Sequence, residues 1–143
     1  MSIPNFNLRI DDLAHDGVPV FLHAVNPLQA LQSAVEASFK WLYGSLDKAP
    51  TKSFSHYPCS PTHTQYSVEV ILLVLRAMPG VAYTTGSHSH KEIHLSLDYI
   101  LKSADRAKDE IMGVLVHEVV HCYQYNGQGK CPGGLIEGIA GKS

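Results

Sequence analysis

The sequence predicts an α+β fold in one domain, residues 1–143, with a mixed sheet beside long helices. Two kinds of segment predict this class. Short β-branched or alternating stretches are typical of strands. Two longer stretches are typical of helices, because one repeats its apolar residues with helical spacing and the other is apolar nearly all round. A chain of 143 residues is also long enough to bury one sizeable core.

The N-terminal part is predicted to form a strand and then a helix. Phe6 to Ile10 alternates apolar and polar side chains, which is typical of a strand. Asp16 to Pro19 is predicted to form a turn. Asn26 is a good N-cap and Pro27 suits the first helical position, so a helix is expected from there to Gly44.

The middle of the chain is predicted to supply the rest of the sheet. Asp47 to Thr64 is rich in proline, serine, histidine and threonine and is predicted to be a loop. Tyr66 to Ala77 is apolar on both faces at its centre, so we expect an interior strand. Val81 to Thr85 is a short strand, and the regular alternation of Glu92 to Leu97 favours an edge strand.

The next predicted helix, capped near Ser103 and ended by Gly127, carries the pattern His-Glu-Val-Val-His. His117 and His121 lie one turn apart on one helix face, so both can bind one metal ion. Glu118 can then act as a base on a metal-bound water. This arrangement is typical of a zinc hydrolase.

The flanking residues are apolar nearly all round the helix, which predicts burial on most sides. Buried polar groups need partners, and a metal ion is one. The alternative is two core histidines bonded to backbone carbonyls. Catalytic zinc needs a third protein ligand. Glu137 is the only carboxylate downstream, and the Pro132-Gly133-Gly134 turn allows a short helix from Leu135 to bring it back.

Composition excludes other partners. The formal net charge is −2 and no basic run is interleaved with aromatics, so nucleic acid is not expected. The longest apolar stretch, Val68 to Met78, is too short and too charged for a membrane span. The N-terminus lacks a basic segment followed by an apolar one, so we expect no secretory signal and a cytoplasmic protein.

Three cysteines, Cys59, Cys122 and Cys131, do not suggest a disulfide framework. Reduced thiols are the default expectation, and Cys122 can pair with Cys131 only in an oxidising compartment. Cys122 is also a conceivable zinc ligand, although it points about 100° away from His121 on the helix.

The stretch from His117 to Ala140, with its Asn126-Gly127 turn and Gly-Leu-Ile-Glu-Gly-Ile-Ala segment, resembles the plant basic secretory protein family and its fungal and bacterial relatives. The resemblance extends back to Leu8 and covers most of the chain. It implies a zincin-like fold and one zinc ion held by His117, His121 and Glu137, with Glu118 as general base. It also implies an edge strand above the active-site helix that pairs with the substrate backbone; Glu92 to Leu97 is the expected strand.

Two departures from the family pattern stand out. The family motif continues with Asp where this chain has Gly141, and only Lys142 and Ser143 follow. We therefore expect a C-terminally truncated member with an incomplete C-terminal helical part. The plant members are secreted, whereas no signal sequence is evident here.

The resemblance implies a zinc-dependent metallopeptidase that acts on a peptide or protein substrate. The alternative is a non-catalytic zinc-binding or interaction protein that retains the fold. A third hypothesis is a hydrolase of non-peptide bonds. The residue that stabilises the oxyanion stays open among Tyr83, Tyr123, Tyr125, His88 and His90. Peptide specificity and oligomeric state are not predicted.

Overall fold

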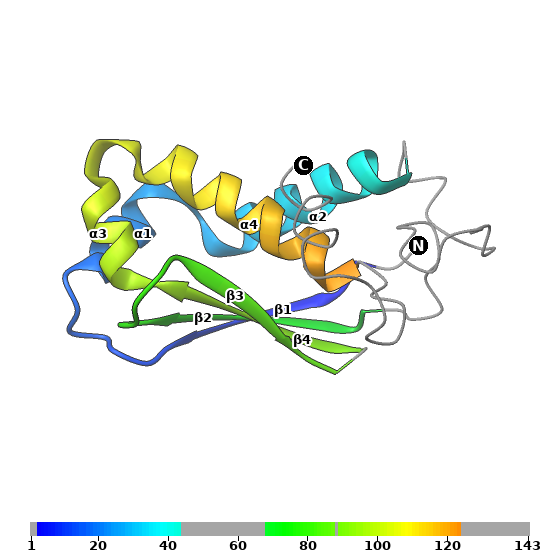
Figure 1. The fold of residues 1–143 in the computed structure, drawn as a ribbon, viewed down its shortest axis with the longest axis horizontal. Coiled ribbons are helices and arrows are strands. Elements are labelled where there is room, and N and C mark those ends of the chain that lie inside the picture. The colour runs from blue at the N-terminus through cyan, green and yellow to red at the C-terminus, as the bar shows by residue number, and fades with distance from the viewer. Residues whose placement is uncertain (1–2, 44–67, 88, 124–143) are drawn as a thin grey trace.

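The computed structural model describes residues 3–43, 68–87 and 89–123. The elements follow one another along the chain (Figure 1) as β1 (Asn5–Ile10), α1 (Gly17–Ala24), α2 (Pro27–Tyr43), β2 (Val70–Arg76), β3 (Ala82–Gly86), β4 (His90–Ser96), α3 (Leu97–Ser103), the 3₁₀ turn η2 (Ala104–Arg106) and α4 (Ala107–Tyr123). The predicted loop from Asp47 to Thr64, the helix end at Gly127 and the short helix from Leu135 lie outside the described residues.

The strands form a mixed sheet in the order β1-β2-β4-β3. β1, β2 and β4 run parallel, whereas β3 runs antiparallel to β4. The predicted strand from Phe6 to Ile10 and the interior strand within Tyr66 to Ala77 are confirmed, because β2 lies between β1 and β4. The coarse α+β prediction with a mixed sheet is therefore confirmed.

The prediction of an edge strand at Glu92 to Leu97 is wrong. β4 is an interior strand with β2 on one side and β3 on the other, and Leu97 already belongs to α3. Alternation suggested solvent on one face, but the polar side chains of β4 have local partners. His94 Nε2 lies 3.1 Å from Glu92 Oε1, and the Ser96 hydroxyl donates to the Met78 carbonyl at 2.8 Å. The edge strands are β1 and β3.

The predicted turn at Asp16 to Pro19 is also wrong, because α1 begins at Gly17. Proline is tolerated in the first turn of a helix, where its missing N–H would have no intrahelical partner. The start of α2 is as predicted. Asn26 Oδ1 accepts a hydrogen bond from the backbone N–H of Gln29 at 3.1 Å, so it caps the helix.

The helices pack on one face of the sheet, with α4 running beside α2 (Figure 1). Ile111, Leu115 and Val119 of α4 are fully buried against this sheet and the other helices. The long helix predicted around the His-Glu-Val-Val-His pattern is thus confirmed as far as Tyr123. Within the described ranges, no helix is long and apolar enough to cross a membrane.

Candidate functional site

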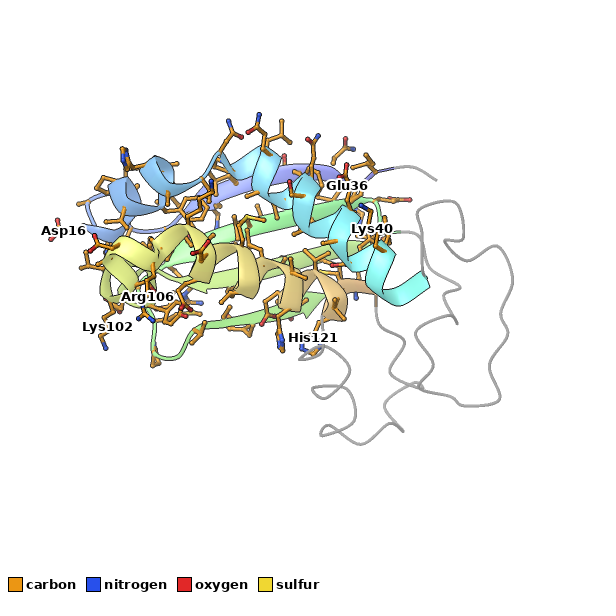
Figure 2. The ribbon with its side chains drawn as sticks, turned by 90° about the horizontal axis from the view of Figure 1, so that it is seen from above. Asp16, Glu36, Lys40, Lys102, Arg106 and His121 are labelled. Carbon is orange, nitrogen blue, oxygen red and sulfur yellow. The ribbon has the colours of Figure 1, made fainter. Side chains whose placement is uncertain are left out.

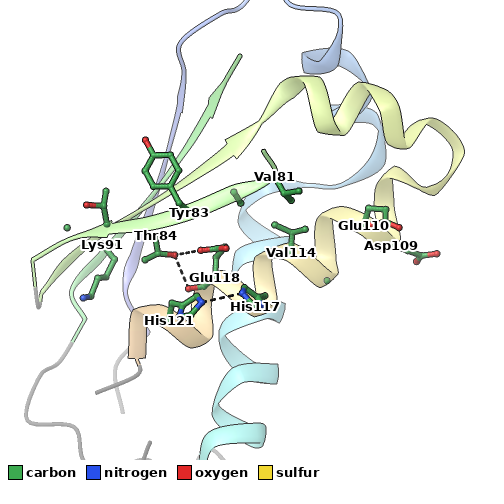
Figure 3. Close-up of a pocket in the computed structure, with 14 residues that line it drawn as sticks. Val81, Tyr83, Thr84, Lys91, Asp109, Glu110, Val114, His117, Glu118 and His121 are labelled. Carbon is green, nitrogen blue, oxygen red and sulfur yellow. Dashed lines mark hydrogen bonds between the residues drawn. The ribbon is translucent and has the colours of Figure 1, made fainter. Parts of the chain in front are cut away.

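A groove of about 820 Å³ runs between the edge strand β3 and α4 (Figure 3). One wall is the strand from Val81 to Gly86. The other is a single stripe of α4, whose residues recur every three or four positions as helix geometry requires. This stripe comprises Asp109, Glu110, Gly113, Val114, His117, Glu118 and His121. All three residues predicted on the helix therefore line one groove.

The two histidines face each other across one helical turn (Figure 3). His117 Nε2 and His121 Nε2 lie 3.2 Å apart, and the ring planes are inclined by 78°. Both rings are partly buried. Viewed from above, His121 projects on the side of α4 that is turned away from α2 (Figure 2).

This spacing fits a shared metal ion. Two nitrogen ligands, each about 2.0–2.1 Å from a tetrahedral zinc ion, lie about 3.3 Å from each other. The measured 3.2 Å between the two Nε2 atoms matches that separation. The same distance also allows one ring to donate a hydrogen bond to the other. The residue predicted as the third ligand, Glu137, lies outside the described residues; within them no group of three ligand-type side chains converges.

Glu118 is held from the sheet side of the groove. Its side chain is only 6% exposed, and its Oε2 accepts a hydrogen bond of 2.6 Å from the Thr84 hydroxyl (Figure 3). The same hydroxyl lies 3.2 Å from the Glu118 backbone carbonyl. A hydroxyl has a single hydrogen, so the shorter contact to the carboxylate is the stronger one. Thr84 therefore fixes the Glu118 carboxylate beside the histidines.

Thr84 was not identified from the sequence. It lies on β3 opposite Ile93 of β4, and Ile93 points into the core beneath the helices. That register places Thr84 on the helix-facing side of the sheet. The alternation of side chains along β3 indicates which face of the sheet carries Thr84. The packing of β3 against α4 then decides that Glu118 is the partner of Thr84.

Cys122, which the sequence left as a conceivable zinc ligand, faces the core instead of the groove. It is 4% exposed, and burial raises the pKa of its thiol from 9.0 to about 12. Because the side chain is buried and does not line the groove, this position does not favour a ligand role. Cys122 forms no disulfide within the described part of the chain, and Cys131 lies outside it.

The described oxyanion candidates are engaged in other ring contacts or hydrogen bonds. The Tyr83 ring stacks on His94 with centroids 4.5 Å apart, on the face of the sheet opposite Thr84 (Figure 3). Tyr123 packs edge-on against Phe39 with centroids 4.7 Å apart, and His90 Nδ1 lies 2.9 Å from the Ser89 hydroxyl. Tyr125 and His88 lie outside the described residues.

Comparison with protein families identifies the family of this chain. The profile of the BSP family, described as peptidases of plants and bacteria, matches residues 3–141, and this confirms the resemblance seen in the motif region. Comparisons with curated proteins and with solved structures found no match.

Proposed function

Because the chain belongs to the BSP family of peptidases of plants and bacteria, we propose that it is a zinc-dependent metallopeptidase that hydrolyses peptide bonds. The observation that carries this proposal is the approach of the His117 and His121 Nε2 atoms to 3.2 Å on the wall of a groove. Glu118, the proposed general base, lines the same groove one residue along the helix.

The proposed ligands of one zinc ion are His117, His121 and Glu137. A zinc ion held there would supply Lewis-acid chemistry and lower the pKa of a bound water from about 15.7 toward 7. The proposed fold is zincin-like, with the helix α4 carrying the ligands beneath an edge strand.

Glu118 is proposed to accept the proton of the attacking water on its carboxylate and to pass it to the amine nitrogen that leaves. The Thr84 hydroxyl donates a hydrogen bond of 2.6 Å to Oε2 of this carboxylate, so Oε1 is left for the proton transfer. A carboxylate held by a charge-assisted hydrogen bond keeps its orientation between substrates. Thr84 is thus proposed as a positioning residue.

We propose that β3 pairs with the substrate backbone, the role expected from the sequence for Glu92 to Leu97. β3 is one of the two edge strands of the described sheet and lines the groove from Val81 to Gly86. An extended peptide can add to such an edge through main-chain hydrogen bonds. A peptide bound this way would run between β3 and α4, past His117 and Glu118.

The substitution Glu118→Gln tests this proposal. We expect cleavage of a fluorogenic casein to fall by about 10²- to 10⁴-fold, with bound zinc unchanged, because the amide cannot accept the proton. Glu36→Gln makes the same chemical change on the exposed surface of α2 and should cleave normally (Figure 2). Equal cleavage by the wild type and Glu118→Gln would contradict the proposal. Full zinc occupancy without any cleavage would instead indicate the non-catalytic alternative.

A further inference from the structure

The charges of the groove are separated along its length (Figure 3). Lys91 lies near His121 at one end, whereas Asp109 and Glu110 lie at the other. Among the described residues that line the groove, Lys91 is the only lysine or arginine. The two ends therefore offer opposite charges to anything bound between them.

The route of Lys91 into the groove depends on a glycine. Lys91 lies on β4 directly opposite Gly86 of β3, so no β3 side chain screens it at that register position. Gly86 has φ +116°, and a Cβ there would lie 2.2 Å from the His90 carbonyl oxygen, so only glycine fits. The lysine side chain can thus pass the end of the edge strand into the groove.

Lys91 lacks a carboxylate partner in the part of the chain that the structure describes. Its side chain lines the groove at the same end as His121 of α4 (Figure 3). Glu110, in contrast, already pairs with Arg106 at 3.7 Å.

The length of the groove suits a short extended peptide. At about 1.5 Å per residue, the helix between Asp109 and His121 spans about 18 Å. An extended chain advances about 3.3 Å per residue, so about five residues fit between the two charged ends.

We propose that this groove selects peptide substrates by charge, with Lys91 binding an acidic side chain close to the scissile bond. This inference rests on the proposed peptidase function and specifies its substrate class. Asp109 and Glu110 would repel the same acidic side chain if the peptide lay in the reverse direction, so they fix the orientation as well. A neutral or basic residue at the Lys91 end is bound less well.

The test is a set of alanine-based peptides in which one glutamate, glutamine or lysine is moved through each position. For the wild-type chain, we expect glutamate to exceed glutamine in kcat/KM by about fivefold at one position, as a partly exposed ion pair allows. Lys91→Met should abolish that preference, so that kcat/KM for the glutamate peptide falls to the value for the glutamine peptide. Lys91→Glu should reverse it in favour of lysine, and Lys91→Arg should keep it.

Lys102→Met serves as the matched control, since this exposed lysine of α3 lies at the other end of the molecule from His121 (Figure 2). The inference is overturned if no position favours glutamate over glutamine, or if the preference survives in Lys91→Met. It is also overturned if Lys91→Met lowers kcat equally for all peptides, because Lys91 would then act in the chemical step.

Peptide binding separates this inference from the proposed function. Dissociation constants of the glutamate and glutamine peptides are measured on the Glu118→Gln chain, where turnover plays no part. A glutamate preference that is lost in the double variant Glu118→Gln, Lys91→Met supports charge selection even if the wild type cleaves nothing. Cleavage that requires Glu118 but shows no preference in binding supports the peptidase and overturns charge selection.

Discussion

The two faces of α4 have the same backbone and opposite chemistry. The face toward β3 carries His117, Glu118 and His121 on the wall of a groove. The face toward the sheet and the other helices carries Ile111, Leu115, Val119 and Cys122, each less than 5% exposed. On the core face, burial keeps the Cys122 thiol neutral. The groove face holds polar groups within reach of a substrate. We therefore expect substitutions on the core face to change stability and those on the groove face to change chemistry.

The largest effect on stability is expected for Leu115→Ala. Leu115 is fully buried, so loss of its side chain should lower the free energy of unfolding by about 2–5 kcal/mol. Zinc binding by the folded fraction should be retained. Denaturant unfolding measures the loss, and Leu101→Ala, at a residue 41% exposed on α3, should cost under about 0.5 kcal/mol. A similar cost at both positions would remove the distinction between core and surface on which the comparison depends.

A smaller effect, confined to catalysis, is expected for Thr84→Val. Valine keeps the shape of threonine but cannot donate the 2.6 Å hydrogen bond to Glu118. A hydrogen bond to a charged group contributes about 1.5–3 kcal/mol, so kcat should fall by about 10- to 100-fold while KM changes little. Thr84→Ser restores the hydroxyl and should recover most of the rate. If serine performs no better than valine, Thr84 contributes packing and does not position Glu118.

The smallest effect is expected at alkaline pH. Burial raises the pKa of the Cys122 thiol in the folded chain from 9.0 to about 12. Unfolded chains therefore lose this proton first, and stability present below pH 9 is lost as the pH rises toward 12. Compared with Cys122→Ala, the wild type should lose at most about 1.4 kcal/mol of unfolding free energy per pH unit in this window. Urea unfolding at pH 8.5 and 10 measures the difference, and parallel curves for both chains would show that Cys122 is not buried in this way.

Local patterns predicted one part of this molecule well. The capping of α2 by Asn26 and the pairing of His117 with His121 depend on residues a few positions apart, and both appear in the structure. The BSP family match likewise agrees with the motif region.

Contacts between distant segments were not predictable. The alternation of Glu92 to Leu97 is visible in the sequence and favours an edge strand. The pairing of β4 with β3, which makes β4 an interior strand, is not visible in the sequence. Thr84 and Lys91 reach the groove only because β3 packs beside α4. No spacing rule links Thr84 to Glu118 across that interval of sequence. The third zinc ligand, Glu137, stays a prediction because it lies outside the described residues.

The most direct test of the central claim is the zinc content of the purified chain after exhaustive dialysis, measured by mass spectrometry for the wild type and for His121→Ala. The account predicts one zinc ion per wild-type chain and a loss of affinity of at least about 10²-fold in His121→Ala, with His23→Ala on the exposed face of α1 unchanged. Equal zinc binding by the wild type and His121→Ala, or none by the wild type, would contradict it.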